Sequence, residues 1–325
     1  MQPATQPRPK KTAAALIRPA TEADLVTADY LMRVAFSTFL GLSDPSQFMG
    51  DAGYVISRFR SDPSSAFVAT VNGQVVGSNF ATRWGSVGFF GPLTVRPDLW
   101  DQGIGRQLMD PIMKCLERWG VSHAGLFTFA HSPKHVGFYQ TLGFWPRYLT
   151  PIMARAVTPP AANVAYQLIS SARDGDLARW LAGCRAVAND VYPGLDLGSE
   201  IQAVRTLGLG DTVLLENART IEGFAVCHIG PGTEGGSGTC FVKFGAVRPG
   251  DDAPAAFTRL LDACNAFAVA RGATKVVAGV NTSRHDAYRI MLARGFASFL
   301  QGVTMHRPNE PGYSLPDRFV IDDWR

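Results

Sequence analysis

An internal repeat constrains the fold of this chain more than any other feature of its sequence. Four short motifs recur 152 positions further along, as from Val95 to Val247, within the 325 residues. They are Asp24-Leu25 with Asp176-Leu177, Val95-Arg96-Pro97 with Val247-Arg248-Pro249, Gly120 with Gly272, and Gly143-Phe144 with Gly295-Phe296. Self-similarity at a fixed offset predicts two copies of one structural unit. The chain is also long enough for two domains of ordinary size, each with its own core.

We therefore expect two domains joined by a short linker. The first sixteen residues carry proline, glutamine and basic residues but no long apolar run, so 1–16 is predicted to be a flexible tail and not a secretory signal. The first domain is placed at 17–157 and the second at 164–325. The proline-containing stretch 158–163 between them is the predicted linker. A cytoplasmic location is expected.

The spacing of apolar residues in the first copy predicts alternating helices and hairpin-linked strands. Asn72-Gly73 supplies the positive φ angles that a two-residue hairpin needs. Period-3.6 and period-2 patterns predict helices at 25–39, 54–60, 104–116 and 134–142, and strands at 66–71, 74–82, 87–95, 124–130 and 148–156. The second copy keeps a similar pattern, with a helix at 255–270 and a buried strand at 276–280. This order indicates a mixed α/β (α+β) fold.

Composition excludes several classes of function. Apolar residues make up 46% and charged residues 18% of the chain, and no stretch has the roughly 18 uncharged apolar residues of a membrane-spanning helix. The net charge of +4 is spread along the sequence, so no basic stripe predicts a nucleic-acid partner. Five cysteines occur without a Cys-x-x-Cys pair or a histidine at metal-ligand spacing. We expect reduced core thiols and no metal site.

A strand, a loop with two glycines and a helix follow one another at 93–109. Free N–H groups and the positive dipole end at a helix start can bind an anion, and glycines let a phosphate approach the backbone. A pyrophosphate would fit at 102–106, although such glycines also serve ordinary tight turns. A dinucleotide fingerprint would need a third glycine where Leu108 stands, and a Walker loop would need Gly-Lys-Ser/Thr.

Two motifs in the first copy resemble the GNAT superfamily of acyl-CoA N-acyltransferases. Trp100-Asp101-Gln102-Gly103-Ile104-Gly105 is similar to the family signature R/Q-x-x-G-x-G/A, with tryptophan in place of the leading Arg or Gln. Tyr139-Gln140-Thr141-Leu142-Gly143-Phe144 matches a second element, Y-x-x-x-G-F. The resemblance covers most of 16–156. It implies two tandem GNAT-like domains, each a mostly antiparallel mixed sheet flanked by helices, with a splayed strand pair.

The resemblance also implies an activity and its residues. Acetyl-CoA would be the cosubstrate, without a metal, and a primary amine on a small molecule or peptide would attack its thioester directly. Tyr139 would protonate the departing sulfur. The residues implied to bind the cosubstrate are Leu93, Thr94, Val95, Trp100, Asp101, Gln102, Gly103, Ile104, Gly105 and Arg106. The nature of the acceptor and the state of assembly, monomer or homodimer, stay open.

The general base is the least defined group. An amine with a pKa near 10 must lose a proton before it attacks, yet 74–95 contains no aspartate or glutamate. His131 and His135 follow the predicted strand at 124–130, and the pKa of an imidazole suits proton transfer. Both histidines can equally be local structural groups. Ser132 and Pro133 resemble the cap and first residue of a helix.

The second copy lacks each of these chemical groups. At the offset of 152, Gly103 and Gly105 correspond to Ala255 and Phe257, and Tyr139 corresponds to Met291. A phenylalanine would block the approach of a phosphate, and a thioether cannot donate a proton. We therefore expect a degenerate second domain. A non-catalytic acyl-CoA sensor and a plain interaction module remain alternatives, and 319–321 is expected to add a strand to one of the sheets.

Overall fold

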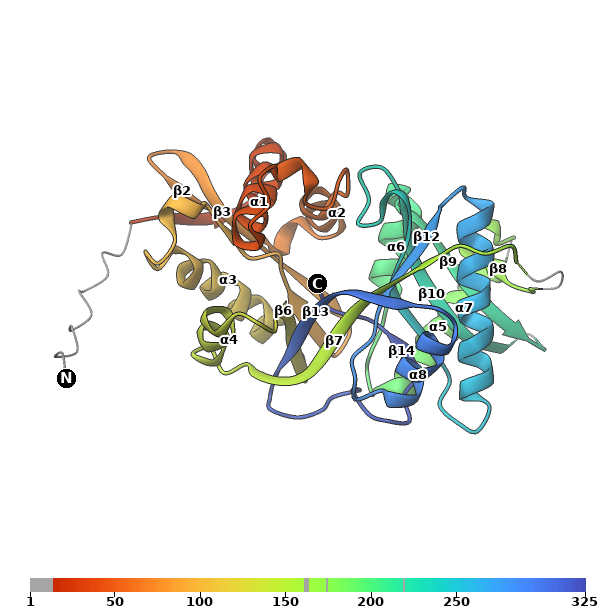
Figure 1. Cartoon of the computed structure of the whole chain (residues 1–325). Coiled ribbons are helices and arrows are strands. Elements are labelled where there is room, and N and C mark those ends of the chain that lie inside the picture. Colours follow the sequence, from red (N-terminus) through yellow and green to blue (C-terminus); the bar gives the residue numbers. More distant parts are fainter. Residues whose placement is uncertain (1–13, 161–163, 174, 219) are drawn as a thin grey trace, which may run out of the picture.

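The computed structural model describes residues 14–160, 164–173, 175–218 and 220–325. Most of the tail expected at 1–16 and half of the linker expected at 158–163 lie outside these residues. Each half of the chain forms one lobe of the molecule, and the C-terminal end of the chain lies between the two lobes (Figure 1).

The first lobe contains the helices and strands expected from the first copy. Its strands are β1 (Leu16–Pro19), β2 (Ala66–Val71), β3 (Gln74–Trp84), β4 (Val87–Phe90), β5 (Thr94–Val95), β6 (His123–Phe129) and β7 (Trp145–Ala156). Its α-helices are α1 (Leu25–Leu40), α2 (Tyr54–Ser61), α3 (Ile104–Trp119) and α4 (Pro133–Gln140). Short 3-10 helices lie at Glu22–Asp24, Pro45–Gln47, Pro63–Ser65 and Pro97–Leu99.

The second lobe repeats this order of elements. Its strands are β8 (Gln167–Leu168), β9 (Gly210–Asn217), β10 (Thr220–Gly230), β11 (Gly236–Val247), β12 (Lys275–Gly279), β13 (Ala297–Arg307) and β14 (Val320–Ile321). Its helices are α5 (Asp176–Val191), α6 (Gly198–Leu207), α7 (Ala253–Ala270) and α8 (His285–Ala293), with a 3-10 turn at Ile169–Ser171. Shifting α1, β6, α4 and β7 by 152 positions places them on α5, β12, α8 and β13 to within a few residues, as the motif offset predicts.

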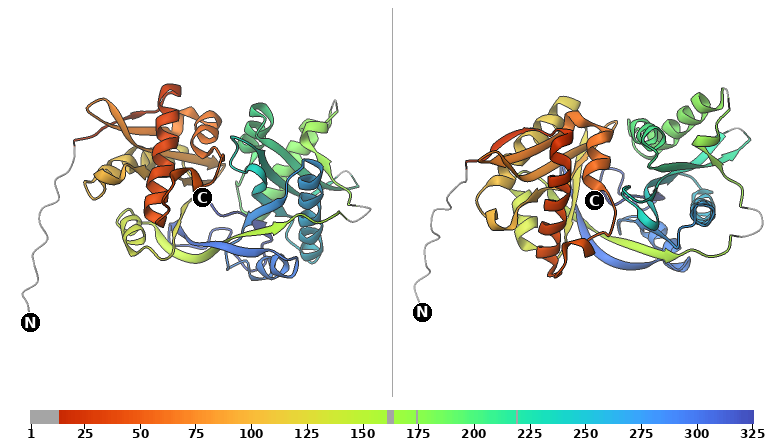
Figure 2. Two further views of the ribbon diagram at one scale, coloured as in Figure 1. Left: turned by 45° about the horizontal axis from the view of Figure 1, so that its top comes forward. Right: turned by 90° about the horizontal axis from the view of Figure 1, so that it is seen from above.

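The final strands of the two halves are exchanged. β7 pairs antiparallel with β12 of the second lobe, and β13 pairs antiparallel with β6 of the first. β7 and β13 also pair with each other, from Ala297↔Ala154 to His306↔Trp145. Figures 1 and 2 show these two long strands crossing between the lobes. A single continuous sheet therefore joins the halves, and the expected closing strand at 148–156 completes the sheet of the second lobe.

The strand expected at 87–95 is broken in two. β4 ends at Phe90 and β5 begins at Thr94, and both pair with β3. Gly91 has φ +139°, and Pro92 has no N–H to donate to the ladder. These two residues interrupt the strand. They separate β4, which pairs with β6, from β5, which pairs with β3 alone among the described strands.

Buried ionic groups also connect the two lobes. Arg58 of α2 pairs with Glu234 of the second lobe, with Nε 3.2 Å from Oε1, and both side chains are almost fully buried. The ammonium of Lys243 lies 2.9 Å from Glu234 and 2.8 Å from Glu200. Arg58 also donates a hydrogen bond of 2.6 Å to the carbonyl oxygen of Gly91. The second lobe is thus connected through Arg58 to the break between β4 and β5.

The structure also bears on the cysteines, on membrane-spanning helices and on metal-binding clusters. The five cysteines are all buried and unpaired, as expected for reduced core thiols. Within 14–160, 164–173, 175–218 and 220–325, no helix has the length and apolar character needed to cross a membrane. The same residues contain no cluster of histidine, cysteine and acidic side chains suited to a metal ion.

Candidate active site

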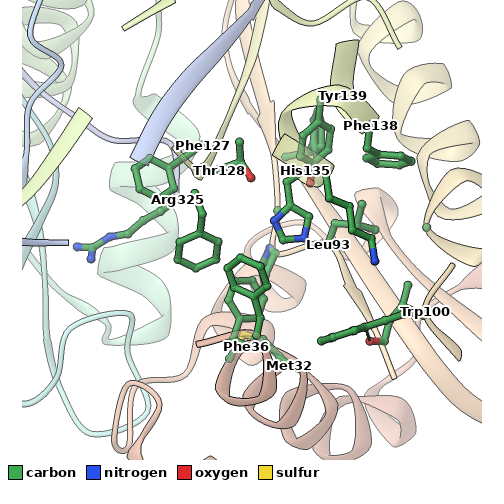
Figure 3. Close-up of a pocket in the computed structure, with 18 of the residues that line it drawn as sticks. Met32, Phe36, Leu93, Trp100, Phe127, Thr128, His135, Phe138, Tyr139 and Arg325 are labelled. Atoms are coloured by element: carbon green, nitrogen blue, oxygen red, sulfur yellow. Dashed lines mark hydrogen bonds between the residues drawn. The ribbon is translucent and has the colours of Figure 1, made fainter. Parts of the chain in front are cut away.

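A cavity opens where β4 and β6 part. These parallel strands pair from Val87↔His123 to Phe89↔Gly125. Beyond this point β5 stays paired with β3, while β6 remains paired with β13 along its other edge. The cavity has a volume of about 540 Å³, within the usual range for small-molecule sites. Its walls come from α1, β4, the loop into α3, β6 and α4, and from Leu300, Trp324 and Arg325 of the second half. Figure 3 shows Trp100 and Arg325 toward opposite ends of the site.

Most of the residues implied by the family motifs line this cavity. They are Leu93, Val95, Trp100, Asp101, Gly103, Ile104, Gly105, Arg106 and Tyr139. Three of the predicted residues are not among its lining residues. Thr94 is buried, Gln102 donates a hydrogen bond of 3.3 Å to the carbonyl oxygen of Asp98, and His131 is exposed.

The start of α3 has the geometry of an anion site. Gly103 precedes the helix with φ +81° and ψ 0°, a conformation that favours glycine, and no side chain of the described residues caps the helix there. The first N–H groups of an uncapped helix are left for a ligand or water, and they carry the positive end of the dipole. The Nε1 of Trp100 donates a hydrogen bond of 2.7 Å to the carbonyl oxygen of Val95. Trp100 therefore ties this loop to β5.

Two cations flank the loop. Lys134 of α4 lies 3.0 Å from a carboxylate oxygen of Asp101, with its ammonium 5.6 Å from the centre of the Trp100 ring. Arg106 donates a hydrogen bond of 2.9 Å to the hydroxyl of Thr141. Sequence reasoning named Arg106 but missed Lys134, because 33 positions separate Lys134 from Asp101. The one signal in the sequence for a role of Lys134 was its position at the start of the helix that follows β6.

Tyr139 lies among aromatic side chains deep in the cavity. Its ring centre is 5.8 Å from that of Phe90 and 5.0 Å from that of Phe138. Burial raises the pKa of Tyr139 well above its ordinary value of 10. The phenol therefore keeps its proton throughout the neutral pH range.

The two candidate histidines differ in their surroundings. His135 lines the cavity, and its Nδ1 is buried without a hydrogen-bond partner among the described residues. Burial, followed by the nearby charge of Lys134 and by His131, lowers the pKa of His135. His131 stacks on Phe39 with ring centres 5.7 Å apart. Ser132 caps α4 by accepting a hydrogen bond from the N–H of His135, and Pro133 is the first helical residue, as the sequence predicts.

The corresponding place in the second lobe is filled by the chain itself. β11 pairs in parallel with β12 from Thr239 to Val242, and beyond this β14 pairs with β11 at Gly245↔Ile321 and Ala246↔Val320. At the offset of 152, Gly245 and Ala246 correspond to Leu93 and Thr94. The expected strand at 319–321 therefore joins the second sheet and fills the gap between its parted strands.

The substituted residues of the second lobe belong to its core. Phe257 and Met291 stand at the positions of Gly105 and Tyr139 and are fully buried. Both pack with the apolar residues of α7, α8 and the second sheet. These side chains stabilise the lobe by burial, at the place where the first lobe has its cavity.

Comparison with known proteins agrees with this arrangement. Residues 33–144 match the model of the acetyltransferase (GNAT) family. No curated protein sequence matches the chain significantly. A putative acetyltransferase from Pyrococcus horikoshii is similar in structure, with a TM-score of 0.69, 14% identity and 95% of each chain covered.

Two further solved structures share the fold. A GCN5-related N-acetyltransferase from Sphaerobacter thermophilus has a TM-score of 0.60 and 16% identity, covering 90% of this chain and 95% of its own. A tandem GNAT protein from the clavulanic acid biosynthesis pathway has a TM-score of 0.58 and 15% identity, covering 90% and 98%. The chain thus shares the fold of a solved tandem GNAT structure. Within this fold, residues 33–144 are the part that matches the acetyltransferase (GNAT) family model.

Proposed function

We propose that this protein is an N-acetyltransferase that moves an acetyl group from acetyl-CoA directly to a primary amine, with the N-terminal half as the active one. The observation that carries the proposal is that one continuous cavity is lined both by the uncapped start of α3 and by Tyr139. This cavity lies where β4 and β6 separate. The family match in the same half supports it.

The residues present fit acetyl-CoA. The N–H groups at 104–106 would bind its pyrophosphate, with Arg106 and Lys134 supplying positive charge. β5 pairs with β3 on one side, and its other edge faces the gap. The backbone groups of Leu93 and Val95 would pair with the pantetheine there. The thioester would then lie near Tyr139.

The chemistry needs one group that accepts a proton and one that donates a proton. The amine nitrogen bonds to the acetyl carbonyl carbon, the carbon–sulfur bond breaks, and the sulfur takes a proton from Tyr139. His135 would accept the proton that the amine loses, since the residue lines the cavity and its lowered pKa leaves the ring neutral at pH 7. We place His135 ahead of His131 in this role because His135 lines the cavity.

The second lobe would not bind the cosubstrate. β14 takes the edge of β11 that a pantetheine would need, and Phe257 fills the position of Gly105. This supports one cosubstrate site per chain. The second lobe instead supplies β13, Trp324 and Arg325 to the cavity of the first.

Release of free CoA thiol tests the proposal. Acetyl-CoA incubated with the protein and a mixture of primary amines should give amine-dependent thiol release and acetylated products detectable by mass spectrometry. Binding of acetyl-CoA without turnover of any amine would identify a sensor. Absence of binding would leave an interaction module as the function.

Replacement of Lys134 tests the position of the pyrophosphate. We expect Lys134→Ala to weaken acetyl-CoA binding about tenfold, because a charge-assisted contact to a phosphate is lost. Lys114→Ala, which removes an exposed ammonium from α3, is the matched control and should leave the dissociation constant unchanged. Calorimetry measures the affinity for acetyl-CoA. Equal losses of affinity in the two variants would show that Lys134 acts only through the net charge of the protein and does not contact the pyrophosphate.

A further inference from the structure

The two ends of the cavity differ in chemistry. One end carries the charged side chains of Asp101 and Arg106 near the start of α3, together with Lys134 of α4. The other end is lined by large apolar side chains, among them Met32, Phe36, Phe39, Phe48, Phe127 and Trp324. Figure 3 shows Phe36 and Phe127 directed toward the space beyond His135, away from Trp100. A group bound there must lose its water against aromatic rings.

Trp324 gives this apolar end a fixed wall from the second half of the chain. Its Nε1 donates a hydrogen bond of 2.8 Å to the hydroxyl of Tyr313, and Tyr313 in turn bonds to Asp322. The ring lies against Gly125 of β6 so closely that a Cβ at Gly125 would overlap it. Trp324 also has φ +54°, a strained value for a large side chain. Such strain persists only where the surroundings determine the conformation, as the contacts with Tyr313 and Gly125 do here.

The charge at this end is already balanced. The Nε of Arg325 lies 3.3 Å from Asp323, and its guanidinium is 4.2 Å from the centre of the Phe241 ring in the second lobe. Asp101, at the opposite end, is the one residue with a side-chain carboxylate among those that line the cavity within the described chain. An ammonium or a polyamine bound at the apolar end would therefore find no acidic side chain among these lining residues, and burying its charge against aromatic rings would be costly.

We propose that the acceptor is a primary amine on an apolar body of aromatic size, and that Trp324 and Phe36 select it. This inference rests on the proposed function. The amine nitrogen would reach the thioester between His135 and Tyr139, and the body would occupy the space between α1 and Trp324. The second half of the chain would thus determine acceptor specificity without binding a cosubstrate itself.

Steady-state kinetics with matched amines test this inference. With acetyl-CoA held constant, kcat/KM for 2-phenylethylamine should exceed that for ethylamine by about 30-fold or more, since the phenyl group leaves water. Spermidine, which carries several charges, should react more slowly than 2-phenylethylamine. The ratio of the two monoamines should fall about tenfold in Trp324→Ala and in the milder variant Phe36→Ala, mainly through KM.

The controls separate this inference from the proposed function. Tyr30→Ala removes an exposed ring from the outer face of α1 and should leave the ratio unchanged. Calorimetry of acetyl-CoA checks that each variant is folded. Equal rates with ethylamine, or faster rates with spermidine, would overturn the inference while the acetyltransferase activity stands. A second experiment compares hexanoyl-CoA with acetyl-CoA as the acyl donor. If the enzyme prefers hexanoyl-CoA, and if Trp324→Ala abolishes this preference, the apolar end binds the acyl group and the inference is overturned. Absence of turnover with every amine would contradict the proposed function itself.

Discussion

Tyr139→Phe should lower kcat about 100-fold while the dissociation constant of acetyl-CoA changes less than twofold. A positioned general acid contributes roughly 10²- to 10⁴-fold to a rate, and the smaller value applies because a thiolate is itself a fair leaving group. The substitution keeps the ring, so the aromatic packing with Phe90 and Phe138 is retained. Only the hydroxyl that would protonate the sulfur is lost. Pre-steady-state and steady-state measurements of thiol release give kcat directly.

Tyr166→Phe provides the matched control for this loss. Tyr166 is partly buried against the core of the second lobe and lies outside the cavity. Its replacement should leave kcat unchanged. A Tyr139→Phe enzyme with full kcat would show that solvent or another group protonates the sulfur, and would remove Tyr139 from the mechanism.

Glu234→Gln should lower the free energy of unfolding by about 3 kcal/mol. Breaking one partner of a buried ion pair leaves the other charge uncompensated, at a cost of roughly 3 to 5 kcal/mol. The side chains of Arg58 and Glu234 are 2% and 0% exposed, so water cannot replace the lost carboxylate. Urea denaturation followed by fluorescence measures the change. Glu22→Gln breaks the exposed pair with Arg60 and should cost less than about 1 kcal/mol.

The loss of stability at acid pH should depend on the same buried ion pairs, those of Glu234 with Arg58 and Lys243. Burial opposes ionisation of Glu234, but the charges of Arg58 and Lys243 outweigh it and lower its pKa to about 2. A carboxyl whose folded pKa is depressed stabilises the fold above its unfolded pKa of 4.5, and this contribution is lost as the pH falls toward 2. Stability of the wild type should therefore decline between these values more steeply than that of Glu234→Gln. Equal slopes would contradict the ion-pair account.

The repeat made much of the fold predictable. Motifs such as Val95-Arg96-Pro97 mark the same turn in each copy, and their common offset anticipated the match of α4 with α8 and of β7 with β13. Local chemistry also sufficed for the hairpin at Asn72-Gly73 and for the cap of α4 at Ser132. These features depend on neighbouring residues, which a sequence displays directly.

Most of the features that sequence reasoning missed depend on contacts between distant residues. β7 and β13 have equivalent positions in the repeat, so their periodicity cannot show that each completes the sheet of the other half. The ion pair of Arg58 with Glu234 spans 176 positions. Trp324 follows β14 of the second sheet and yet lines the cavity of the first lobe, a contact that local patterns cannot show. The strand break at Gly91-Pro92 had a local signal in its proline, but the apolar run on either side favoured one continuous strand.

Calorimetric titration of acetyl-CoA into the wild type and Gly105→Phe is the most direct test of the cosubstrate site. A Cβ at Gly105 would lie 3.9 Å from both Phe138 and Val95, so a small side chain fits, but a phenyl ring would extend into the cavity. Ala255→Phe adds the same bulk at the exposed start of α7 and serves as the control. We predict one site per chain in the wild type and in Ala255→Phe, and its loss in Gly105→Phe. Binding that survives in Gly105→Phe but is lost in Ala255→Phe would place the site in the second half and contradict this account.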